Sequence, residues 1–288
     1  MKISVYPNVP PMTCLPRFVA AIMLCCCIAI SEVSAQGNLL VTPVRVVFEG
    51  QKRAEELNLA NSGKDTARYL ISFVEIRMNK NGTFEQINEP DSGQQFASKY
   101  LRFFPRSVVL GPNEAQVIKL QLTNAGELTA GEYRSHLYFR AVPDEKPAGE
   151  NIPKKDSGGI NVKLTPIFGI TIPVIIRVGE TKASVQLTDL SVDRVNTPAP
   201  GLNLLFNRLG NSSVYGDITV DYISPQGKVT QVAVARGLAV YTPNTQRQLH
   251  LALEKKPGVN YQTGKLHVSY TTTSKTVTEQ LAQAELKL

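Results

Sequence analysis

Residues 159–178 read GINVKLTPIFGITIPVIIRV, and this stretch decides the fold. Its even-numbered positions from Ile160 to Val178 are apolar, with Pro166 the one irregular member, and most odd positions are polar, small or proline. Side chains of a β-strand point alternately to its two faces, so this period of two predicts a strand. At about 3.3 Å per residue the strand would extend on the order of 60 Å, several times a common strand of about 5 to 6 residues. We expect such a strand to do more than complete one sheet.

After Gln36 the sequence consists of short apolar runs divided by turn residues, without a 3.6-residue apolar stripe, which predicts an all-β chain. Pro43 indicates that the first strand lies at a sheet edge or changes partner there. Asn81-Gly82 is a strong signal for a tight hairpin turn. The predicted strands cover 39–48, the segment around Leu57 and Leu59, 68–78, 83–87, 107–110, 115–123 and 131–141.

The strand predicted at 131–141 separates its side chains by face. We expect Tyr133, Leu137 and Phe139 to pack inward, and the opposite face, which carries Arg134, His136, Tyr138 and Arg140, to be wet. Residues 143–159 have almost no apolar content and are predicted to be a mobile loop. This loop joins the strand to the long strand, so the two are expected to form a hairpin.

The strand pattern restarts after residues 179–182, which form a plausible hinge. A further seven strands are predicted near 185–192, 202–206, 217–223, 229–235, 249–253, 266–270 and the end of the chain at Leu288. Strands of this number and spacing predict two immunoglobulin-like β-sandwich domains in series, at 36–179 and 180–288.

Residues 1–35 read as a secretory signal peptide, with Lys2 and Arg17, a short apolar run at 18–30 and a small-residue cleavage site at 33–35. The mature chain is then expected to begin near Gln36 without an integral membrane segment. All four cysteines lie within the first 35 residues, so the mature chain has no disulfide and no thiolate metal site. An exported chain without disulfides fits a bacterial envelope protein better than a small extracellular eukaryotic module.

Catalytic signatures are absent from the sequence: it has no GxSxG elbow, no HExxH and no phosphate-binding loop. The three histidines fall on three separate predicted strands. We therefore expect no enzyme activity, no metal and no cofactor. The formal net charge of +7 is scattered, and no basic run interleaved with aromatics indicates a nucleic-acid partner.

A binding function remains, and the long strand is the candidate for it. Its first half follows the polar loop, and exposed alternating apolar side chains beside unpaired backbone groups favour addition of the strand to a partner's incomplete sheet. The predicted donor segment carries Leu164, Pro166, Phe168 and Ile170. Alternatively, these residues are the core of an ordinary long strand.

Three further segments, together with the long strand, resemble the periplasmic pilus-assembly chaperones of the P-pilus chaperone superfamily. They are TPVRVVFEG at 42–50, LGPNEAQVIKLQL at 110–122 and EYRSHLYFRAVP at 132–143. The resemblance covers the first domain, whereas the second matches mainly in size and strand count. It implies two immunoglobulin-like domains in a boomerang arrangement, with the last strand of the first domain completing a pilin subunit until an outer-membrane usher accepts that subunit.

The resemblance also implies a basic pair that anchors the subunit's terminal carboxylate. The arginine of this pair corresponds to Arg45, but the lysine position is occupied by Pro173, which has neither charge nor backbone donor. Arg134, on the neighbouring strand, is our candidate for the second charge. The predicted partners are therefore fimbrial subunits and an usher. The alternatives are an exported structural sandwich, meaning a pilus subunit or adhesin, and a hydrolytic or sugar-binding β-sandwich.

Overall fold

The computed structural model describes residues 39–143, 167–193, 200–274 and 277–288. These residues form β-strands and two short 3-10 turns, η1 (Ser98–Tyr100) and η2 (Ala125–Glu127). The predicted signal peptide at 1–35 lies outside the described residues.

In the described ranges we find no helix with the length and apolarity that crossing a membrane requires.

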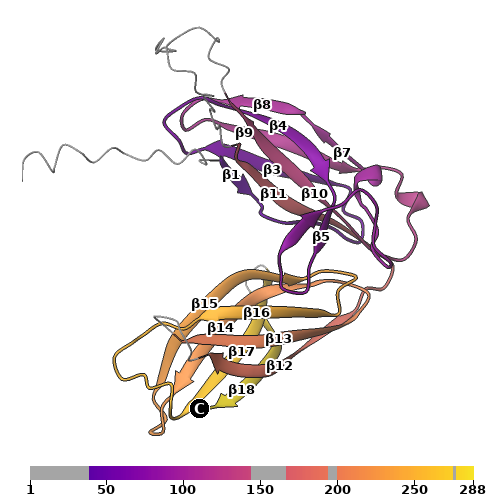
Figure 1. The fold of residues 1–288 in the computed structure, drawn as a ribbon. Helices are drawn as coiled ribbons and strands as arrows, with labels where there is room; N and C mark the ends of the chain where they lie inside the picture. The colour runs from indigo at the N-terminus through magenta and orange to yellow at the C-terminus, as the bar shows by residue number, and fades with distance from the viewer. Residues whose placement is uncertain (1–38, 144–166, 194–199, 275–276) are drawn as a thin grey trace, which may run out of the picture. The chain divides into compact units, whose positions relative to one another are not determined.

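The first half of the chain forms a sandwich of two sheets (Figure 1). One sheet has the order β1-β3-β9-β7, with β1 Leu39–Thr42, β3 Ala54–Asn61, β9 Ala115–Leu122 and β7 Leu101–Phe104. The other has the order β2-β11-β10-β4-β8, with β2 Val46–Phe48, β11 Gly169–Val178, β10 Gly131–Val142, β4 Ala67–Val74 and β8 Ser107–Leu110. Alternate apolar residues of both sheets fill the space between them, among them Leu57, Leu59, Ile118, Leu120, Leu137, Phe139 and Val174.

The strand predicted at 39–48 is divided in two at Pro43. Its first part, β1, pairs with β3 in one sheet, and its second part, β2, pairs with β11 in the other. The predicted change of partner at Pro43 is confirmed. Because proline has no backbone N–H to donate, a strand changes sheets there without losing a ladder hydrogen bond.

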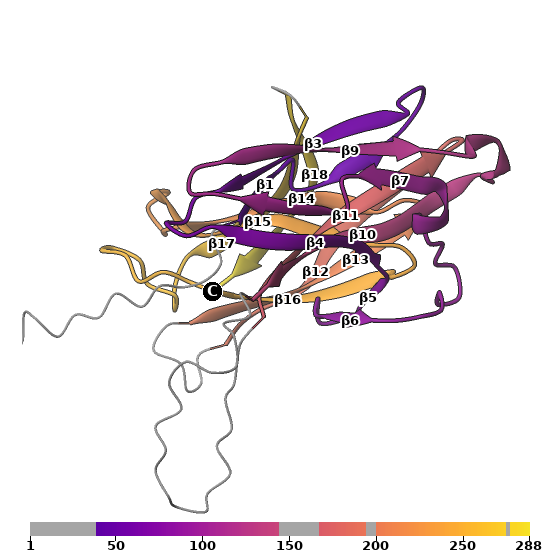
Figure 2. The ribbon, with the colours of Figure 1, turned by 90° about the horizontal axis from the view of Figure 1, so that it is seen from above.

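The strand predicted at 68–78 is also broken, at Glu75. β4 ends at Val74, and β5 (Ile76–Met78) turns at the predicted Asn81-Gly82 site into β6 (Phe84–Gln86), forming a small separate hairpin (Figure 2). Gly82 has a φ of 82°, a conformation that glycine adopts without strain. The prediction of a tight hairpin is confirmed, but the prediction of one continuous strand is wrong.

The predicted hairpin of 131–141 with the long strand is confirmed, because β10 and β11 pair antiparallel from Gly131↔Val178 to Arg140↔Gly169. The described part of the long strand is the ten-residue β11. Its residues 160–166, including Leu164 and Pro166, lie outside the described residues, as does most of the polar loop.

The expectation that the polar face of β10 is wet is wrong at its N-terminal half. Arg134 and His136 are only 3% and 4% exposed, and Glu132 on the same face is 4% exposed. Farther along, Tyr138 is half-buried and Arg140 is exposed. The N-terminal half is covered because residues of the second sandwich and of the β5–β6 hairpin pack over it, as described below.

The second half of the chain forms a second sandwich, which contains a strand at each predicted position. One sheet has the order β12-β13-β16, with β12 Ala183–Asp193, β13 Gly201–Gly210 and β16 Gln246–Ala252. The other has the order β15-β14-β17-β18, with β15 Val229–Val240, β14 Val214–Ile223, β17 Lys265–Ser274 and β18 Val277–Lys287. Its core includes the edge-to-face pair Phe206 and Tyr270, whose ring centroids are 5.1 Å apart. The chain is all-β, with two β-sandwiches in series.

Candidate binding site

The candidate site lies on the outward face of the β2-β11-β10-β4-β8 sheet. Alternate residues of one strand share a face, so Glu132, Arg134 and His136 project together from β10. Arg45 immediately precedes β2, the strand on the other side of β11. Since β11 lies between β2 and β10, the sheet places Arg45 on one side of β11 and Arg134 on the other.

Glu132 joins the two sandwiches. One of its carboxylate oxygens accepts hydrogen bonds from Arg177 Nε (3.1 Å) and from the backbone N–H and Oγ of Ser213 (both 2.9 Å). The other accepts a hydrogen bond from Thr242 Oγ1 (3.1 Å). A buried carboxylate is stable only when it is paired and hydrogen-bonded, and Glu132 meets both conditions.

Arg45 and Arg134 meet at the ring of Tyr241. The guanidinium carbon of Arg134 is 4.2 Å from the ring centroid, and that of Arg45 is 5.8 Å from it and 4.7 Å from the centroid of Tyr215. The two residues predicted from sequence to act together are therefore neighbours. Burial is the main cause that lowers the pKa of both guanidinium groups, and each charge lies close to other cations.

Neither guanidinium uses all of its donors. Arg45 Nη2 donates to Ser213 Oγ at 3.3 Å, and Arg134 Nη2 donates to the carbonyl of Ile76 at 3.2 Å. Arg45 Nη1, Arg134 Nε and Arg134 Nη1 are buried and have no hydrogen-bond partner. Buried donors are nearly always satisfied, so three unpaired donors on two adjacent cations indicate a site for an anionic acceptor.

The edge of β11 beside these arginines is partly open. β2 pairs with β11 in parallel only from Val46↔Val174 to Phe48↔Ile176. Among the described residues, no strand pairs with that edge from Gly169 to Pro173. Phe168, just before β11, is 46% exposed, and Ile170 packs against the core at the same end of the sandwich. Of the predicted donor residues, these two are therefore placed at the open edge.

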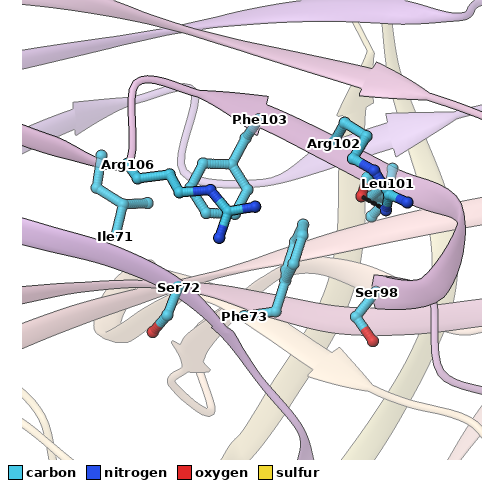
Figure 3. A pocket seen from close by; sticks show the side chains of 8 residues that line it. All are labelled: Ile71, Ser72, Phe73, Ser98, Leu101, Arg102, Phe103 and Arg106. Carbon is cyan, nitrogen blue, oxygen red and sulfur yellow. Dashed lines mark hydrogen bonds between the residues drawn. The ribbon is translucent and has the colours of Figure 1, made fainter.

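A cavity of about 210 Å³ lies elsewhere in the first sandwich, between β4 and β7 (Figure 3). The rings of Phe73 and Phe103 meet there edge-to-face at 5.2 Å, and Arg106 extends over Phe103 at 6.0 Å. Its lining contains no carboxylate, histidine or thiol, so it offers no group for acid–base or metal chemistry. The lining residues are Ile71, Ser72, Phe73, Ser98, Leu101, Arg102, Phe103 and Arg106.

Metal ligands do not gather anywhere in the described part of the chain, where no group of three His, Cys, Asp or Glu side chains is placed to hold an ion. The three histidines lie on β10, β16 and β17, as the sequence predicts.

Sequence reasoning did not find Tyr241, Glu132 or Ser213, which form much of the site. Tyr241 follows β15 and Ser213 precedes β14, so both reach the site from the ends of strands in the second sandwich. The hydrogen bond between Glu132 and Ser213 joins residues 81 positions apart. Glu132 could have been found from the sequence, because the period of two places it on the same face of the predicted strand as Arg134 and His136.

No protein-family model matches the chain, and no curated protein sequence matches it. Among solved structures, the chain is similar to the YadV chaperone, with 10% identity and a TM-score of 0.43 over 88% of this chain and 100% of that chain. It is similar to the Pseudomonas aeruginosa CupB2 chaperone, with 14% identity and a TM-score of 0.42 over 86% and 100% of the two chains. A third match is a Salmonella enterica SafA pilin in complex with the SafB chaperone, with 14% identity and a TM-score of 0.40 over 88% and 98%.

Proposed function

We propose that this chain is a periplasmic chaperone that binds fimbrial subunits by donor-strand complementation and delivers them to an outer-membrane usher. One observation carries the proposal: the open edge of β11 ends beside two arginines whose buried donors are unpaired. The sequence resemblance described above supports the same reading, and the first 35 residues support export. No cofactor is needed, because folding of the bound subunit would use only backbone pairing and apolar contact.

The direction of β2 specifies how a subunit strand would bind. β2 runs parallel to β11 and begins at Val46, opposite Val174. A subunit strand could pair with residues 169–173 on the same side of β11 as β2, also parallel to β11. Such a strand would run toward the start of β2. Its C-terminus would then face Arg45, the residue before β2. Main-chain hydrogen bonds would set the register, while Phe168, with Leu164 and Pro166 before it, would fill the subunit's incomplete core. Ile170, which packs against the core of the first sandwich, would hold the end of this donor segment in place.

The terminal carboxylate of that strand matches the unpaired donors. A carboxylate has two oxygens that accept from a guanidinium in a planar, bidentate arrangement, and such charge-assisted bonds are stronger than bonds between neutral groups. The ring of Tyr241 lies 4.2 Å from the guanidinium carbon of Arg134, so the carboxylate would bind beside this ring. The unpaired donors of Arg45 and Arg134 would then hydrogen-bond the terminal carboxylate of the bound subunit.

Co-expression with candidate pilins, followed by co-purification, tests the proposal. We expect the wild-type chain to retain a subunit from the periplasmic fraction, and Arg45→Ala or Arg134→Ala to lose it. Arg106→Ala, which removes an exposed arginine beside the cavity described above, is the matched control and should retain the subunit. Failure of the wild-type chain to retain any pilin would contradict the proposal, and self-assembly of the purified chain would favour a pilus subunit instead.

A further inference from the structure

Phe84, on the β5–β6 hairpin, adjoins the arginine pair but takes no part in the proposed anchor. It is 54% exposed, although an aromatic side chain of this size is commonly buried. Its ring centroid lies 6.2 Å from that of His136 and 6.4 Å from that of Tyr241. Tyr241 is the same ring that contacts Arg134 at 4.2 Å, so one side chain connects the exposed aromatic to the cation.

The hairpin that carries Phe84 is firmly held. Met78, on β5, is 3% exposed and packs in a cluster with Ile175, Ala239 and Tyr241. The carbonyl of Met78 accepts a hydrogen bond from Asn244 Nδ2 at 2.6 Å. Phe84 is the register partner of Met78. The ring of Phe84 is therefore presented from an anchored position.

The tip of the hairpin is fixed as well. The carbonyl of Lys80 accepts a hydrogen bond from the backbone N–H of Gln248, on β16, at 2.7 Å. Arg247 lies so close to Gly82 that a Cβ there would be 2.8 Å from Arg247 Nε. Since Met78 and the turn both contact the second sandwich, the exposure of Phe84 does not result from a detached loop.

The rings behind Phe84 form a neutral apolar support. Burial, and secondly the charge of Arg134, lowers the pKa of His136 to about 3, so its imidazole is uncharged at neutral pH. His136 is also the register partner of Pro173, a half-buried apolar residue of β11 at the end of the open edge. An aromatic surface therefore lies next to Arg134 and beside Pro173, where the open edge ends.

We propose that Phe84 forms an aromatic subsite for the side chain of the bound subunit's C-terminal residue, so that the site selects a large apolar or aromatic residue at that end. The inference rests on the proposed function, because it takes the terminal carboxylate to bind Arg45 and Arg134. With the carboxylate at the arginines, the side chain of the same residue is within reach of the exposed face of Phe84. Burial of that face against an apolar side chain favours such ligands over glycine.

Labelled decapeptides of alternating threonine and valine test the inference by fluorescence anisotropy. Each peptide ends in phenylalanine, alanine or glycine, as the free acid or as the amide. For the wild-type chain we expect the phenylalanine acid to bind about tenfold more tightly than the glycine acid, and the amides to bind weakly. Phe84→Ala should bring the phenylalanine and glycine acids within about twofold of each other, and Phe84→Tyr should restore the difference.

Phe104→Ala is the matched control, since Phe104 is a 75% exposed phenylalanine on β7 and should leave the preference unchanged. Equal binding of the phenylalanine and glycine acids by the wild-type chain, with the amides still weak, would overturn the aromatic subsite and leave the proposed function standing. Equal binding of acids and amides would overturn the carboxylate anchor, and the subsite with it. Thermal unfolding of each variant checks that the hairpin substitution leaves the fold intact.

Discussion

Replacing Phe168 by alanine should weaken subunit binding without disturbing the free chain. Phe168 is 46% exposed and is not among the residues that pack against the core of the first sandwich. A phenylalanine side chain offers about 200 Å² of surface, so roughly 90 Å² remains to be buried in a subunit. At about 25 cal/mol per Å² this burial contributes about 2.3 kcal/mol, or about 50-fold in Kd.

Isothermal titration of the purified chain with a subunit that it retains in co-purification measures this change. Phe168→Ala should raise Kd by about 50-fold. Phe104→Ala, which removes a similarly exposed ring from the other sheet, should leave Kd unchanged. The midpoint of thermal unfolding of the free chain should move little in either variant. A Kd for Phe168→Ala within about twofold of wild type, in a folded variant, would refute the donor-strand reading of this residue.

Three further predictions concern the arginine site. Arg45→Ala and Arg134→Ala should each remove charge-assisted bonds of about 1.5 to 3 kcal/mol and weaken subunit binding by about 10- to 150-fold, as measured by titration against the Arg106→Ala control. Glu132→Ala should lower the free energy of unfolding by about 3 to 5 kcal/mol, because it leaves Arg177 without its buried carboxylate. Urea unfolding measures this change, and a decrease of less than about 1 kcal/mol would contradict the bridging role of Glu132. The pKa of His136 is lowered in the folded chain to about 3 by burial and by Arg134, so the unfolded chain binds the extra proton between about pH 6.5 and 3. The contribution of His136 to the free energy of unfolding is therefore complete above about pH 6.5, and below that pH it falls on the order of 1 kcal/mol per pH unit. In urea unfolding at pH 7.5, 6 and 5, the free energy of unfolding of His136→Gln should fall less steeply with decreasing pH than that of the wild type.

The strand pattern was predictable wherever side chains alternate over a buried face. β8, β9 and β10 lie where the alternation predicts them, within a residue or two, because each has one face in the core. The break at Glu75 was not predictable by this route, since apolar residues stand on both sides of it at Val74 and Ile76. β7 was missed because Phe103 and Phe104 are adjacent apolar residues, which a period of two does not describe.

The site was predictable only in its cations. Arg45 and Arg134 were selected from a resemblance and from their place on the strands, and the structure places them at one aromatic ring. Tyr241 and Ser213 could not be found, because their contacts join residues far apart in the sequence and depend on the packing of one sandwich against the other. The face of the strand that carries Arg134 and His136 was expected to be solvated, whereas the second sandwich and the β5–β6 hairpin cover these two residues.

The unpaired donors of Arg45 and Arg134 are more easily explained by binding than by stability. A buried cation costs free energy unless every donor is satisfied, and apolar residues of similar volume often make a fold equally or more stable. Glu132 shows that this site can satisfy a buried charge completely, with four hydrogen bonds to its carboxylate. The neighbouring arginines nevertheless keep three donors free, next to residues 169–173 of β11, a stretch that β2 leaves open. Local departures from optimal folding tend to coincide with functional sites, and here the free donors and the open edge describe the same ligand, an extended strand that ends in a carboxylate.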